Sequence, residues 1–145
     1  MRLVLASQSP ARLATLRSAG LDPEVVVSGV DESEVTDTDP AVLALTLATM
    51  KAEAVAANQE QAYVIGCDSV LELDGAIHGK PADASEAVGR WRQMRGSTGV
   101  LHTGHCLIDT ATWRQVRRAA ATTVWFADLD DEEIEAYVAH GEPLH

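Results

Sequence analysis

Signals for the start of a helix recur along this chain, and each follows a segment with the residues of a β-strand. The four candidate N-caps are Ser9, Asp39, Asp83 and Asp130. Proline follows the first two, and glutamate stands three residues after the last two, as in a capping box. Capped helices that alternate with strands predict an α/β protein, in which helices flank a sheet.

The expected helices begin at these caps and end near Gly20, Asn58, Met94 and His140. The expected strands are 2–6, 24–28, 63–66, 69–73, 76–77, 100–109 and 115–126. Three consecutive valines predict that 24–28 is buried, and Asp74-Gly75 is a typical hairpin turn. The last two strands are expected to be antiparallel neighbours, so the sheet combines hairpins with parallel crossovers.

Length and composition narrow the class of protein. A chain of 145 residues suits one domain, and 46% hydrophobic residues argue against disorder. No apolar run reaches the roughly 18 residues that span a bilayer, and the N-terminal segment is interrupted too early for a signal peptide, so we expect a cytoplasmic protein. A net charge of −11 disfavours nucleic acid and membranes as partners but permits a small anionic substrate where cations gather.

The cysteines and two of the histidines do not suggest a metal centre. Cys67 and Cys106 lack the spacing of a zinc site or a disulfide framework, so buried free thiols are expected. His102 and His105 stand three residues apart on an expected strand and therefore face opposite sides. We interpret both histidines as structural.

The segment LASQSPAR joins the first strand to the first helix and is a candidate phosphate site. Backbone N–H groups at a helix N-terminus attract anions, and Ser7, Ser9 and Arg12 can add hydrogen bonds. A plain capped helix with a surface arginine explains the same residues.

Three carboxylates occur in segments that could form a site. Asp68 comes directly after an apolar strand, where α/β proteins place their sites, and it could bind Mg²⁺ or accept a proton from water. A turn aspartate that bonds its own backbone is the alternative. Asp31 and Glu32 are adjacent carboxylates suited to a hard cation, although acidic loops are usually only solvated.

Lysine is rare in this chain, since only Lys51 and Lys80 among the 11 basic residues are lysines. Lys51 lies on the second helix and could extend harmlessly to solvent. Lys80 stands between Gly79 and Pro81, and the proline restricts its backbone. We therefore expect Lys80 to contribute more to phosphate binding than Lys51. Together these residues could support metal-assisted attack of water on a phosphoanhydride.

The order of the motifs resembles the Maf family. That family has ASxSPRR, an acidic pair, LAxxKA, GADT or GSDQ, GKP, SGxxHxVxT, TxVxF and a helix ending in EPL. This chain has ASQSPAR, VDE, LATMKA, GCDS, GKP, RGSTGVLHT, TTVWF and GEPL in the same order. The resemblance is colinear over the whole chain.

The resemblance implies a twisted mixed β-sheet in two lobes with flanking helices and a central cleft, as in inosine triphosphatase-like proteins. It also implies a pyrophosphatase that uses Mg²⁺ or Mn²⁺ to convert a nucleoside triphosphate into a monophosphate and pyrophosphate, and a homodimer is a family expectation. Asp68 would accept the proton, and Glu32 with Asp68 would hold the metal. The remaining positions by motif are Ser7, Ser9, Arg12, Lys51 and Lys80, which would hold the phosphates.

Three positions depart from the family pattern. Ala11 replaces the first arginine of the pair, Ser69 follows the catalytic aspartate in place of threonine or glutamine, and Gly99 replaces the histidine of SGxxH. Ala11 and Ser69 fall at positions tied to base choice. Family members also continue beyond EPL, so residues 1–145 are expected to form a single Maf-like domain without its C-terminal portion. A weakly active or inactive nucleotide-binding protein linked to septum formation is the alternative function.

Overall fold

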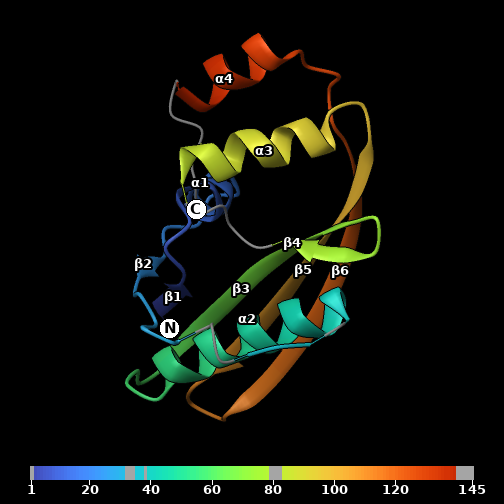
Figure 1. The fold of residues 1–145 in the computed structure, drawn as a ribbon. Helices are drawn as coiled ribbons and strands as arrows, with labels where there is room; N and C mark the ends of the chain where they lie inside the picture. Colours follow the sequence, from blue (N-terminus) through green and yellow to red (C-terminus); the bar gives the residue numbers. More distant parts are fainter. Residues whose placement is uncertain (1, 32–34, 38, 79–82, 140–145) are drawn as a thin grey trace. The chain divides into compact units, whose positions relative to one another are not determined.

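The computed structural model describes residues 2–31, 35–37, 39–78 and 83–139. The chain forms two compact units, the first from residues 1–69 and 102–120 and the second from residues 70–101 and 121–145. The elements are β1 (Arg2–Ala6), α1 (Pro10–Ser18), β2 (Glu24–Val25), α2 (Pro40–Ala56), β3 (Ala62–Leu73), β4 (Ala76–His78), α3 (Ala84–Met94), β5 (Thr98–Asp109), β6 (Arg114–Trp125) and α4 (Asp131–Ala139). The strands β3, β5 and β6 contribute to both units (Figure 1).

The sheet has six strands in the order β2-β1-β3-β5-β6, and β4 pairs with β3 outside this row. Its pairing is mixed, since β1 is parallel to both β2 and β3 whereas β4 is antiparallel to β3. The parallel register pairs Ala6 with Gly66, which fixes how the carboxyl end of β1 lies beside β3. The expected α/β fold with a mixed sheet and flanking helices is confirmed.

In the first unit, α2 packs closely on one face of the sheet (Figure 1). A Cβ atom on Gly66 would lie 2.8 Å from the Cβ of Ala52, and one on Gly104 would lie 2.6 Å from the Cα of Leu45. Glycine is therefore required at both positions for α2 to reach the strands. The core under this helix includes Val4, Ala6, Ala52, Val55, Val64, Cys106 and Ile108.

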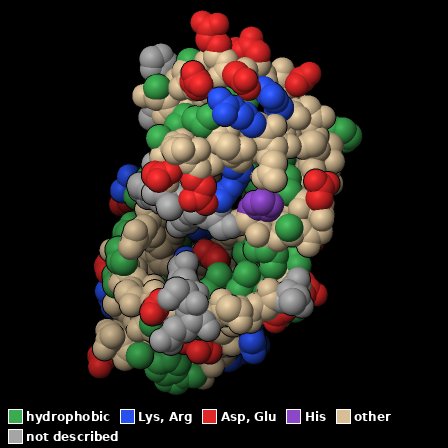
Figure 2. Space-filling view, in the orientation of Figure 1, with side chains coloured by type: hydrophobic (Ala, Val, Ile, Leu, Met, Phe, Trp, Pro, Cys, Tyr) green, Lys and Arg blue, Asp and Glu red, His purple; other side chains and the backbone are tan. Residues whose placement is uncertain are grey.

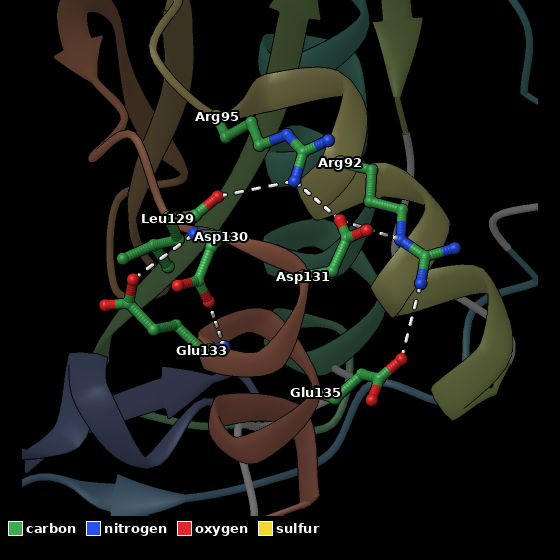
Figure 3. A network of polar contacts seen from close by, with 7 residues as sticks. All are labelled: Arg92, Arg95, Leu129, Asp130, Asp131, Glu133 and Glu135. Carbon is green, nitrogen blue, oxygen red and sulfur yellow. Dashed lines mark hydrogen bonds and ion pairs between the residues drawn. The ribbon is translucent and has the colours of Figure 1, made fainter.

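The second unit contains a hairpin and two helices joined by ion pairs. Asp74 and Gly75 adopt positive φ angles of 49° and 79°, as a two-residue hairpin turn requires. Asp131 of α4 accepts from Arg95 at 2.6 Å and lies 3.4 Å from Arg92 of α3 (Figure 3). Figure 2 shows acidic and basic side chains gathered over these helices. Ile134 of α4 is fully buried, so this unit has an apolar interior as well as its ion pairs.

The predicted helix caps are confirmed in the structure. Ser9, Asp39 and Asp83 each accept a backbone N–H of the helix that they begin. Asp130 and Glu133 form a reciprocal capping box, in which each carboxylate accepts the backbone N–H of the other residue. Among the described residues, no helix has the length and apolar character needed to cross a membrane.

Three of the expected strands were wrong in extent. The predicted buried strand 24–28 is only Glu24–Val25, and the side chains of Val25 and Val27 are 45% and 53% exposed. This segment lies at the sheet edge with β1 as its neighbour, and only Val26 packs against the core. The separate strands 63–66 and 69–73 are one continuous strand, β3. Asp68 therefore lies within a strand and not after its end. A carboxylate is tolerated inside this strand because a lysine of α2 balances its charge.

Candidate functional site

The loop between β1 and α1 holds its two serines in fixed positions. Ser7 is buried, and its Oγ accepts the backbone N–H of Ser9 at 3.1 Å. The Oγ of Ser9 in turn accepts the backbone N–H of Arg12 at 3.3 Å, so Ser9 is the N-cap of α1. Each hydroxyl oxygen is used as an acceptor, so its one hydrogen is left to be donated to another group. This geometry suits an anion bound at the N-terminus of the helix.

Arg12 extends from α1 to the sheet. Its Nη2 donates to the Oγ of Ser69 on β3 at 2.9 Å. The same Oγ lies 3.1 Å from the Oγ1 of Thr103 on β5. The guanidinium therefore contacts side chains of the sheet, and the alternative interpretation of Arg12 as a plain surface arginine is not supported.

Asp68 and Lys51 form a buried ion pair. The Nζ of Lys51 donates to the Oδ1 of Asp68 at 2.9 Å, and the two residues are only 8% and 6% exposed. The interpretation of Lys51 as a solvated helix residue is thus wrong, because the side chain lies buried between α2 and β3. The interpretation of Asp68 as a turn residue is also wrong. The ammonium group offsets the carboxylate charge, because burial of an unpaired charge inside the protein would cost a large free energy.

Successive residues of β3 direct these groups to opposite faces of the sheet. Asp68 faces α2 and Lys51, whereas Ser69 faces Arg12 of α1. Cys67 directly precedes Asp68 and Ser69 on β3, and its thiol is affected by the charged groups of both pairs. Burial raises the pKa of its thiol, Arg12 opposes the rise, Asp68 adds to it, and Lys51 opposes it weakly. All three charged groups therefore lie close enough to one thiol to affect its ionisation.

The sheet register brings the serine loop to the same place. Because Ala6 pairs with Gly66, the next residues along the two parallel strands are Ser7 and Cys67, and Asp68 follows. On the α1 side, a cavity of about 230 Å³ has an apolar wall that includes Leu5 and Ile65. Arg12, Thr103 and His105 are also among the residues that line it.

Not every predicted site residue can be placed. Glu32 and Lys80 lie outside the described residues, so their expected roles stay predictions. Asp31 is exposed, and the described residues contain no group of three or more His, Cys, Asp or Glu that could hold a metal ion. Ala11 is exposed in the first turn of α1, where its backbone N–H has no partner within the helix.

Two features were not predicted from the sequence. Thr103 was assigned no role, although it is the last residue of the motif that resembles SGxxHxVxT. Gly99, in the same motif, has no room for a side chain in the second unit. A Cβ there would lie 2.8 Å from the Cδ2 of Leu73 and 3.0 Å from the carbonyl oxygen of Glu72. The absence of the histidine is therefore matched by close packing.

Comparison with solved structures supports the fold. The chain is similar to a HAM1 protein from Coxiella burnetii, with a TM-score of 0.55 over 89% of this chain and 74% of that one, at 16% identity. It is similarly close to the Ham1 protein of Staphylococcus aureus, with a TM-score of 0.55 over 88% and 73% of the two chains, at 17% identity. These likenesses concern the fold alone.

Sequence comparison identifies much closer relatives. A protein of Streptomyces coelicolor named nucleoside triphosphate pyrophosphatase is 64% identical over 99% of this chain and 71% of its own length. Proteins of the same name from Streptomyces avermitilis and Nostoc punctiforme are 62% and 52% identical, over 99% and 97% of this chain and 71% and 72% of their own lengths. The family model described as Maf-like protein matches residues 2–145. The chain therefore belongs to the Maf-like protein family.

Proposed function

We propose that this protein hydrolyses a nucleoside triphosphate between its α- and β-phosphates and releases a nucleoside monophosphate and pyrophosphate. The observation that carries the proposal is the buried Asp68–Lys51 pair on β3, because the strand register places this part of β3 next to the serine loop that leads into α1. The shared name of the relatives favours hydrolysis over non-catalytic nucleotide binding. Removal of particular nucleotides from the cytoplasmic pool is the role that we infer.

The N-terminus of α1 is the proposed phosphate site. The hydroxyl groups of Ser7 and Ser9 and the N–H of Ala11 would donate to phosphate oxygens, and the helix dipole favours the negative charge. The guanidinium of Arg12 would add charge-assisted hydrogen bonds from the side of the sheet. Lys80 is proposed as a further phosphate ligand from its motif position alone.

Asp68 is the proposed proton acceptor for the attacking water. Lys51 engages Oδ1, so the other carboxylate oxygen, Oδ2, is the one that we assign to the water or to a metal ligand role. The ammonium group of Lys51 would hold the carboxylate in one orientation while it takes the proton.

A divalent cation is the proposed cofactor. Mg²⁺ and Mn²⁺ prefer oxygen ligands, and Mg²⁺ is commonly held by one or two carboxylates together with substrate phosphates, so a cluster of three protein ligands is not required. Asp68 and Glu32 are the proposed ligands. When bound, the cation would neutralise charge that develops on the phosphate oxygens.

Base choice is proposed to involve the position of Ala11, and Ser69 is the other position that the family pattern ties to base choice. Ala11 offers only its backbone and a methyl group, whereas Ser69 is already bonded to Arg12. We infer that Ala11 leaves space near the nucleotide that an arginine would fill. A homodimer is also proposed, from family membership.

A product assay tests the proposed function. The protein is incubated with a panel of nucleoside triphosphates and Mg²⁺ or Mn²⁺, and orthophosphate is measured with and without added inorganic pyrophosphatase. We expect monophosphate as the nucleotide product, and orthophosphate only when the coupling enzyme is present. Orthophosphate without that enzyme would instead identify a general phosphatase, and no product from any nucleotide would contradict the proposal.

A further inference from the structure

Ser69 lies between two side chains that come from different elements of the first unit. Its Oγ accepts from the Nη2 of Arg12 at 2.9 Å and lies 3.1 Å from the Oγ1 of Thr103. The three groups form a chain of polar contacts from α1 through β3 to β5. Thr103 and Arg12 also line the same cavity.

The chemistry of the three groups fixes part of the hydrogen-bond pattern. A guanidinium can only donate, so the Oγ of Ser69 is the acceptor for Arg12. The remaining hydrogen and lone pair of this hydroxyl can be satisfied by Thr103 in either direction. A serine hydroxyl rotates easily, whereas the β-branched Thr103 is restricted about χ1. Of the two hydroxyl groups, that of Thr103 is thus the more rigidly held.

An arginine side chain needs such support to hold one orientation. Its several rotatable bonds carry rotamer entropy, which must be overcome when the head group is fixed. Arg12 is half-buried; its guanidinium donates to Ser69 at 2.9 Å and also forms a hydrogen bond with the thiol of Cys67 on the same strand. A second hydroxyl that fixes Ser69 therefore also restricts Arg12.

We propose that Thr103 is a positioning residue, which acts through Ser69 to hold the Arg12 guanidinium in the orientation that binds substrate phosphate. This inference rests on the proposed function, in which Arg12 is a phosphate ligand. It assigns Ser69 a different role from the one expected by its motif position. Ser69 supports an arginine that binds phosphate. Loss of the Ser69 hydroxyl should therefore weaken the binding of all nucleoside triphosphates equally and should leave base preference unchanged.

The test measures binding of a non-hydrolysable α,β-methylene nucleoside triphosphate by calorimetry, for the whole 145-residue chain. We expect Thr103→Val, which keeps the shape but loses the hydroxyl, to raise Kd about three- to tenfold, as the loss of one hydrogen bond predicts. Thr103→Ser should restore most of the affinity. In an Arg12→Ala background, Thr103→Val should have little further effect, because the two residues act in series.

Thr110→Val is the matched control. Thr110 directly follows β5 and is buried, and its Oγ1 accepts the N–H of Ala62 at 2.9 Å without contact to Arg12. This control should lower the melting temperature and leave Kd unchanged. Thr103→Val should instead raise Kd and leave the melting temperature unchanged. Equal Kd values for the parent protein and Thr103→Val would overturn the inference. So would a loss of affinity that Thr103→Ser fails to restore.

The same experiment separates this inference from the proposed function. A parent protein that binds the analogue but releases no pyrophosphate from any nucleoside triphosphate would contradict the proposed function, while the Kd comparison would still test Thr103. A parent protein that does not bind the analogue would overturn both. Different fold-changes for purine and pyrimidine analogues with Ser69→Ala would return Ser69 to base recognition and would also contradict the positioning role.

Discussion

The ion pair between Lys51 and Asp68 is the feature of single residues that matters most to this account. Both partners are almost fully buried, and removal of one partner leaves an uncompensated charge in the protein interior. Stability and chemistry are therefore linked at this pair, since Asp68 is also the proposed proton acceptor.

Lys51→Met should lower the free energy of unfolding by about 3 kcal/mol, because the carboxylate of Asp68 loses its counter-charge. Adding Asp68→Asn should recover part of this loss, since the amide carries no charge to be left unpaired. Urea unfolding of both variants measures the effect, with Glu53→Gln on the exposed side of α2 as the control. A change of less than about 0.5 kcal/mol, typical of surface positions, would show that the pair is solvated in solution.

The sequence identified Lys51 and Asp68 as candidates, but it could not predict that they pair. Helical spacing left Lys51 a path to solvent, and the apolar run before Asp68 predicted a strand that ends too early. The pairing depends on how closely α2 approaches β3, and Gly66 and Gly104 set that approach. Such close packing between distant segments leaves no periodic signal.

At the scale of elements, local signals were more informative than burial. The caps of all four helices and the Asp74-Gly75 turn follow from short-range chemistry and are confirmed. The expected burial of 24–28 was wrong, because three valines indicate a strand without indicating whether it lies at the centre of the sheet or at its edge. Position within a sheet is a property of the fold.

Gly66→Ala should destabilise the protein by about 2–3 kcal/mol, because the added methyl group would overlap Ala52 and the backbone of Ala48 and so move α2 away from the sheet. Displacement of α2 should also separate Lys51 from Asp68 and reduce turnover. Gly89→Ala on α3 is the control, since nothing lies within 4 Å of its added Cβ. Chemical unfolding should show a gain of about 0.5–1 kcal/mol for the control, and a neutral Gly66→Ala would contradict the close packing.

For the molecule as a whole, buried thiols give stability a dependence on alkaline pH. Burial raises the pKa of the Cys106 thiol, against the opposing effect of a hydrogen bond with Thr49. Above pH about 8.5 the unfolded chain loses this proton while the folded protein keeps it. The unfolded state then binds fewer protons, so the contribution of Cys106 to stability is complete below that pH and is lost as the pH rises.

Cys106→Ala should therefore show a shallower fall of the free energy of unfolding between pH about 8.5 and 10 than the parent protein. Its stability at pH 7 should be lower, because the smaller side chain leaves a gap in the core, so the slopes and not the absolute values are compared. Urea unfolding under reducing conditions measures both. Parallel slopes would show that the Cys106 thiol ionises equally in the folded and unfolded states.

The central claim is that Asp68 takes the proton from the water that attacks the nucleotide. The most direct measurement is pyrophosphate release by Asp68→Asn, beside calorimetric binding of an α,β-methylene nucleoside triphosphate to the same variant. We expect turnover to fall by about 10²- to 10⁴-fold, because the amide keeps the shape of the side chain but cannot accept the proton. Binding of the analogue should survive through the serine loop and Arg12. Turnover within a few-fold of the parent protein, in a variant that is folded and binds the analogue, would remove Asp68 from the reaction.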